Sequence, residues 1–93
     1  MFIWDTGKAI INFEKHRIAF EEAATVFADP NGLEWDDPGH SIVEQRFKRI
    51  GESVLGRILL VVFTLRVSSN ENETIRIISA RQASRKERKA YSR

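Results

Sequence analysis

The 93-residue chain contains no cysteine, and this absence removes several kinds of chemistry at once. Without thiols it can form no disulfide framework, no thiolate nucleophile and no cysteine-ligated zinc site. The longest uninterrupted apolar run, Ile58 to Phe63, is far shorter than the ~20 residues that a transmembrane helix needs. The first residues show no basic region followed by an apolar core of the signal-peptide kind, so we expect a cytoplasmic protein with no membrane association.

The chain is also too short for more than one compact domain, and we expect residues 1–93 to form a single domain. Hydrophobic residues make up 42% of the sequence and charged residues 30%, which indicates a globular chain. A domain of this size buries only about 60–65% of its unfolded surface, so it is expected to gain stability from a partner.

The net charge of +2 hides an asymmetry between the two halves of the chain. Residues 1–45 carry three basic and nine acidic side chains, whereas residues 46–93 carry twelve basic and four acidic side chains, so the net charges are −6 and +8. The halves could neutralise each other in the fold, or the second half could form a basic surface for a polyanion. Arginine outnumbers lysine nine to three in the basic half, and its planar guanidinium suits two-bond contacts with phosphate.

The hydrophobic periodicity predicts an α+β fold with helices at both ends of the chain and a central antiparallel sheet between them. The two leading helices are expected to cover one face of the sheet and to leave the other partly open. Ser84 and Glu87 are spaced as a capping box for the last helix. In chain order we expect an edge strand at 2–4, a helix ending near 16, a helix over 20–27, strands at 33–36, 42–50, 57–66 and 74–80, and a helix over 84–91.

The sequence has no strong catalytic motif, because it lacks GxGxxG, P-loop, GxSxG and HExxH patterns. Asp36, Asp37 and His40 could be imagined as metal ligands. They flank a Pro-Gly pair, however, and fit a solvated turn better. We therefore predict neither a metal nor another cofactor.

Isolated polar residues within apolar strands are better candidates for a site. Alternation along 42–50 places Glu44, Arg46 and Lys48 on one face of that strand. Arg66 and Arg81 each end an apolar strand, where a guanidinium must pair with an anion or reach water.

Three further polar residues have more than one interpretation. His16, which follows Lys15 at the end of the first helix, could interact with the helix dipole or transfer protons beside arginines. Tyr91 could stack on a base or pack against a partner. Arg76 lies five residues before Arg81, so regular pleating would place the two on opposite faces, and only a bulge would let both serve one cleft.

A set of residues distributed almost from end to end gives the chain a family resemblance. The most specific block is Ile75 to Arg81 followed by Ala83, Glu87-Arg88 and Tyr91, and earlier matches include Trp4-Asp5, Lys8, Asn12, Lys15-His16, Phe20 to Ala23, Glu44, Arg46 and Val61 to Thr64 with Arg66. With these residues the chain resembles the BrnT family, small toxins of bacterial type II toxin–antitoxin pairs. It departs from the family at Arg17, because the family usually has glycine after Lys-His.

This resemblance implies a RelE-like α+β fold and a ribonuclease that inhibits translation. It also implies neutralisation by a cognate BrnA-type antitoxin that carries a ribbon-helix-helix domain, through which the complex binds its operator DNA. The implied active-site residues are Glu44, Arg66 and Arg81, together with Lys15, His16 and Arg46.

Metal-free RNA cleavage needs a base for the 2′-OH proton, cations that stabilise the phosphorane, and an acid for the 5′-oxygen. We expect Glu44 to be the base, with His16 as the second candidate or the acid. Arg66 and Arg81 are expected to clamp the phosphate. The predicted RNA-binding residues are Lys15, Arg46, Arg76 and Tyr91. The alternative is a non-catalytic module that binds nucleic acid or a regulatory partner through the basic half.

Overall fold

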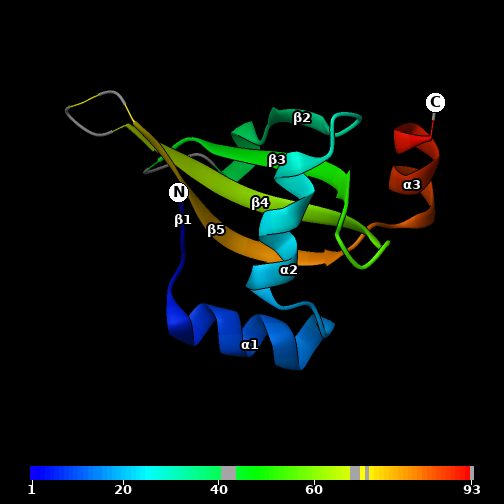
Figure 1. The fold of residues 1–93 in the computed structure, drawn as a ribbon, viewed down its shortest axis with the longest axis horizontal. Coiled ribbons are helices and arrows are strands. Elements are labelled where there is room, and N and C mark those ends of the chain that lie inside the picture. Colours follow the sequence, from blue (N-terminus) through cyan, green and yellow to red (C-terminus); the bar gives the residue numbers. More distant parts are fainter. Residues whose placement is uncertain (41–43, 68–69, 71, 93) are drawn as a thin grey trace.

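The structure is a computed structural model and describes residues 1–40, 44–67, 70 and 72–92. Its helices and strands follow the predicted order, with helices towards both ends of the chain and strands between them (Figure 1). The elements are β1 (Phe2–Ile3), α1 (Thr6–His16), α2 (Phe20–Thr25), the 3-10 helix η1 (Val26–Ala28), β2 (Leu33–Asp36), the 3-10 helix η2 (Pro38–His40), β3 (Arg46–Glu52), β4 (Ile58–Val67), β5 (Glu73–Gln82) and α3 (Arg85–Tyr91).

The five strands form one sheet in the order β1-β5-β4-β3-β2. Strands β2 to β5 pair antiparallel with their neighbours, whereas β1 pairs parallel with β5, so the sheet is mixed but mostly antiparallel. The α+β prediction is therefore confirmed. Several boundaries differ from the prediction by one or two residues. The largest difference is at β3, which begins at Arg46 rather than 42, and residues 41–43 lie outside the described part of the chain.

The core lies between one face of the sheet and the segment formed by α2 and η1. Phe20, Ala23 and Val26 of this segment are fully buried against alternate residues of β4 and β5, among them Val61 and Ile77. This packing follows from the i, i+3 spacing of apolar residues on the helix and their alternation along the strands. In Figure 1, α2 crosses in front of the sheet.

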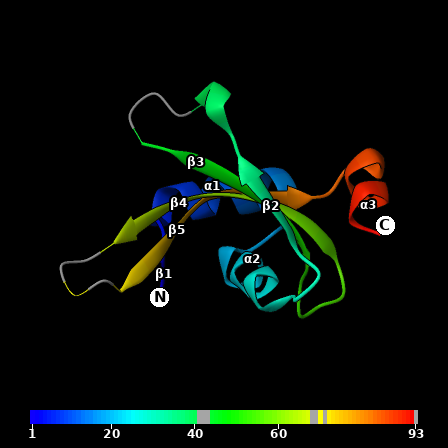
Figure 2. The same ribbon diagram turned by 90° about the horizontal axis from the view of Figure 1, so that it is seen from above.

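Helix α1 lies along the edge of β5 and not over the sheet face, which corrects the expectation that both leading helices cover one face (Figures 1 and 2). Asn12 of α1 is the physical reason. Its Nδ2 donates to the Ala80 carbonyl oxygen at 2.8 Å, and its Oδ1 accepts from the Ala80 N–H at 3.1 Å. The side-chain amide thus occupies the place that another strand would take beside β5, and α1 is held against the edge.

Arg17 ends α1 in the left-handed conformation, with φ of 59° and ψ of 29°. Its backbone N–H donates to the Phe13 carbonyl oxygen at 2.8 Å. Glycine adopts this conformation without steric cost, whereas a residue with a side chain adopts it rarely. The turn between α1 and α2 is therefore formed by Arg17 in a conformation that favours glycine.

Within the described residues, the opposite face of the sheet is covered at one end, by α3. Ile50 of β3 and Leu60 of β4 are buried there with Ala83, and Tyr91 packs against them. The predicted capping box of α3 is present, since Ser84 Oγ accepts from the Glu87 N–H at 3.2 Å and Glu87 Oε1 accepts from the Ser84 N–H at 2.7 Å. We call this side of the sheet, opposite α2, the open face.

A register shift in β5 decides which side chains reach the open face. Val62 pairs with Ser79 but its neighbour Phe63 pairs with Ile77, so Ile78 is an extra residue in β5. Because of this bulge, Arg76 and Arg81 both pair with even-numbered residues of β4 and lie on the same face. Regular pleating would have placed the two on opposite faces, and the bulge is the alternative under which both can serve one cleft.

Candidate active site

The carboxylate of Glu44 joins two arginines from different strands at the open face. Its Oε2 lies 3.5 Å from Arg66 Nε on β4, and its Oε1 lies 3.8 Å from Arg76 Nη1 on β5. The three side chains are between 28% and 52% exposed, so a ligand can reach them. Exposed ion pairs contribute only about 0–1 kcal/mol to folding, so stability is a weak reason for gathering these charges.

Arg46 extends this cluster across the sheet. Thr64 of β4 pairs with Arg46 on one side and with Arg76 on the other, so both arginines flank it on the open face. The predicted alternation of β3 is confirmed within the described residues, because Phe47 turns to the core and stacks on Phe63 with ring centroids 5.6 Å apart. Glu44, Arg46 and Arg66, which the sequence selected for the site, therefore lie in the same part of the open face.

Arg81 lies at the other end of the open face. It pairs in register with Leu60, six residues from Arg66 on β4, which corresponds to about 20 Å along the strand. Its guanidinium donates two hydrogen bonds to Glu87 of α3, at 2.8 and 3.0 Å. This pairing lowers the pKa of Glu87 to about 2, chiefly through the hydrogen bond from Arg81. Arg76, and not Arg81, shares the Glu44 carboxylate with Arg66.

Lys15 and His16 lie at the end of α1, beside the β5 bulge. Together with Lys8, Asn12, Ile78 and Ser79 they line a depression of about 230 Å³. Ser79 pairs with Val62, so its side chain belongs to the open face, and the depression adjoins that face at the sheet edge.

Comparison with known proteins decides the family. The family described as "Ribonuclease toxin, BrnT, of type II toxin-antitoxin system" matches residues 4–87. The chain belongs to the BrnT family of ribonuclease toxins. As a toxin of a type II system, this BrnT-family chain has RNA as its substrate and a cognate antitoxin as its partner.

A solved structure agrees with this assignment. The BrnT-family chain is similar to the crystal structure of the Brucella abortus ribonuclease toxin BrnT, with a TM-score of 0.65 and 27% sequence identity. The match covers 91% of this chain and 99% of the Brucella chain, so the BrnT-like fold is shown. A search of curated proteins finds no match.

Tyr91 of this BrnT-family toxin lies away from the Glu44 cluster, at the covered end of the sheet. Its ring packs against the buried cluster of Ile50 and Leu60, and its hydroxyl donates to Asp29 Oδ2. The Asp29 carboxylate raises the pKa of Tyr91 to about 12. These contacts give Tyr91 a structural role within the fold, which is neither the stacking on a base nor the packing against a partner that the sequence suggested.

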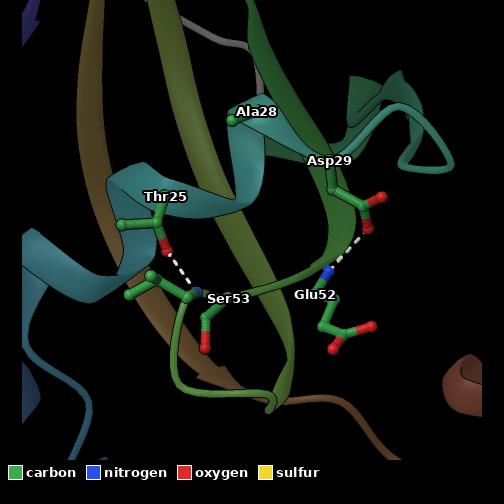
Figure 3. Close-up of a pocket in the computed structure, with 6 residues that line it drawn as sticks. Thr25, Ala28, Asp29, Glu52 and Ser53 are labelled. Atoms are coloured by element: carbon green, nitrogen blue, oxygen red, sulfur yellow. Dashed lines mark hydrogen bonds between the residues drawn. The ribbon is translucent and has the colours of Figure 1, made fainter.

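A depression on the helix-covered side of the toxin is unsuited to RNA. It is lined by residues of α2, η1 and the end of β3, and two hydrogen bonds join residues of its lining (Figure 3). Thr25 Oγ1 accepts from the Val54 N–H at 2.9 Å, and Asp29 Oδ2 accepts from the Glu52 N–H at 2.8 Å. Its charged lining residues, Asp29 and Glu52, are acidic, so the depression would repel a phosphate.

Across the described ranges, no three histidine, aspartate or glutamate side chains gather closely enough to hold a metal ion. The turn expected after Asp36 takes the form of the 3-10 helix η2. The helices in the described part of the toxin are too short or too polar to span a membrane.

Proposed function

We propose that this toxin cleaves RNA without a metal ion, at the open face of its sheet. The Glu44 carboxylate, held between Arg66 and Arg76 on an exposed surface, is the observation that carries the proposal. It combines a base with two cations, which are the groups that cleavage through the 2′-hydroxyl requires.

In the proposed reaction, Glu44 removes the proton from the 2′-OH of the RNA. The 2′-oxygen forms a bond to the phosphorus, the bond from phosphorus to the 5′-oxygen breaks, and the products are a 2′,3′-cyclic phosphate and a 5′-hydroxyl. Arg66 and Arg76 stabilise the additional negative charge of the phosphorane. His16, at the neighbouring sheet edge, donates the proton that the leaving 5′-oxygen takes up.

The other basic residues are proposed to bind neighbouring phosphates of the same strand. Arg46 lies across Thr64 from Arg76, Lys15 lies at the sheet edge and Arg81 lies at the far end of the face. Arg81 is therefore proposed to bind RNA rather than to clamp the phosphate that reacts. Tyr91 is left out of this set because its hydroxyl and ring are engaged within the fold.

The proposed biological effect is inhibition of translation in the cytoplasm, where the toxin would reach its RNA substrate. We propose a BrnA-type ribbon-helix-helix antitoxin as the partner, with the complex binding operator DNA through the antitoxin. An acidic antitoxin segment could neutralise the toxin by covering the basic open face.

The proposal is tested by incubating the purified toxin with RNA in excess EDTA and identifying the ends of the products. Cleavage that leaves a 2′,3′-cyclic phosphate is expected, and Glu44→Gln should abolish it. Lys89→Ala, an exposed change on α3 away from the Glu44 cluster, is the matched control and should cleave normally. Salt-sensitive RNA binding without turnover would instead favour a non-catalytic binding module.

A further inference from the structure

Thr64 occupies an unusual position on the open face. Thr64 is only 1% exposed, yet its Oγ1 has no hydrogen-bond partner within the described part of the chain. A buried hydroxyl without a partner costs about 1–3 kcal/mol, and native structures contain few such groups. A role in ligand binding is one of the explanations that account for such a group.

The surroundings of Thr64 identify the chemistry of that ligand. Arg46 on β3 and Arg76 on β5 pair with it in register, and Arg66 follows two residues later on the same face. Three arginines therefore extend from backbone positions next to Thr64 on the same face. Guanidiniums bind phosphate through two hydrogen bonds, and a hydroxyl can donate a third to the same anion.

We propose that Thr64 is a further phosphate-binding residue of the toxin, and that its hydroxyl donates a hydrogen bond to a non-bridging oxygen of an RNA phosphate held by Arg46, Arg66 and Arg76. This inference rests on the proposed function, because it names one more group that touches the substrate at the same site. The phosphate satisfies the hydroxyl, so the cost of burying it in the free protein is recovered when RNA binds.

The inference predicts opposite effects of one substitution on stability and on binding. Thr64→Val keeps the shape of the side chain and removes the hydroxyl, so the melting temperature should stay the same or rise. The affinity for an RNA whose 2′-hydroxyls are methylated, and which cannot be cleaved, should fall about tenfold. Thr64→Ser keeps the hydroxyl and should retain wild-type affinity.

Thr74→Val is the matched control, because Thr74 pairs with Arg66 on the same face but is only partly buried. It should leave affinity unchanged. Thr64→Ala provides a second variant without the hydroxyl if Thr64→Val does not fold. Competition by inorganic phosphate distinguishes a free phosphate from an RNA phosphate as the bound anion. The wild type should bind RNA far more tightly than inorganic phosphate, and equal affinity for the two would overturn the assignment to an RNA phosphate.

Wild-type affinity in Thr64→Val, or equal losses in Thr64→Val and Thr64→Ser, would overturn the role of Thr64. Failure of the proposed function has a different signature, since the wild-type toxin would then bind the methylated RNA but cleave no RNA. The binding experiment still decides the role of Thr64 in that case.

Discussion

Asn12 and Ala80 pair through both of their hydrogen-bonding groups, with a side-chain amide on one side and a strand backbone on the other. Asn12 Nδ2 donates to the Ala80 carbonyl oxygen at 2.8 Å and to the Ile18 carbonyl oxygen at 3.0 Å. One buried side chain therefore joins the edge of the sheet, α1 and the turn that follows it.

Replacing Asn12 should accordingly destabilise the whole domain. Asn12→Leu leaves the N–H and carbonyl of Ala80 without these partners, and we expect the free energy of unfolding to fall by about 2–3 kcal/mol. Asn12→Asp, which can still accept from Ala80 but cannot donate, should also be destabilised. Urea denaturation measures both, and Ile11→Ala, at a side chain that is 64% exposed, should change stability by less than about 0.5 kcal/mol.

The contact between Glu87 and Arg81 predicts a dependence of stability on pH. The pKa of Glu87 is lowered from 4.5 to about 2, so its carboxylate contributes stability above pH 4.5, and the contribution is lost as the pH falls to 2. Glu87→Gln should be less stable than the wild type by about 1 kcal/mol at pH 7, a value that allows for solvent screening of the half-exposed Arg81.

Urea denaturation at several pH values tests this expectation. The difference between wild type and Glu87→Gln should disappear between pH 4.5 and 2. Ser84→Ala removes the other hydrogen bond of the capping box and should cost about 1 kcal/mol at every pH. A constant difference for Glu87→Gln down to pH 2 would contradict the role of its charge.

Arg17 offers a stabilising substitution. Its φ of 59° is costly for a residue with a side chain, and Arg17→Gly should remove about 1 kcal/mol of this cost. It also removes the contact between the guanidinium and the Phe13 ring, whose centroid lies 5.8 Å away, worth about 0.5 kcal/mol at an exposed site. We expect the free energy of unfolding of Arg17→Gly to rise by about 0.5 kcal/mol, as measured by thermal denaturation. Arg17→Ala should be less stable than the wild type.

Arg76 and Arg81 should differ in their kinetic roles. Because Arg76 shares the Glu44 carboxylate with Arg66, Arg76→Ala should lower kcat by about 100-fold, as loss of a group that stabilises the transition state does. Arg81→Ala should mainly raise KM, since Arg81 lies at the far end of the open face. Steady-state cleavage of a defined RNA separates the two parameters, and a larger loss of kcat in Arg81→Ala would reverse the assignment.

Local features of this fold could be predicted from the sequence. The capping box of Ser84 and Glu87 depends on residues three positions apart, and the faces of β3 follow from simple alternation. Contacts between distant segments could not be predicted. The hydrogen bond from Tyr91 to Asp29 joins residues 62 positions apart, and the pairing of Asn12 with Ala80 joins residues 68 apart. Neither leaves a periodic signal in the sequence.

The candidate site could likewise be predicted only in part from the sequence. Glu44, Arg46 and Arg66 could be selected because each is a polar residue in or beside an apolar strand. The meeting of Arg66 with Arg76 could not be predicted, because it depends on the register between β4 and β5.

The extra residue at Ile78 allows β5 to carry two arginines on one face at an odd spacing. In a regular strand, side chains five positions apart lie on opposite faces, whereas side chains four positions apart share a face. Deleting Ile78 would therefore remove the bulge and still leave Arg76 and Arg81 on the same face. In relatives of this toxin, the two arginines should reach the open face together either at a spacing of five with a bulge or at a spacing of four without one.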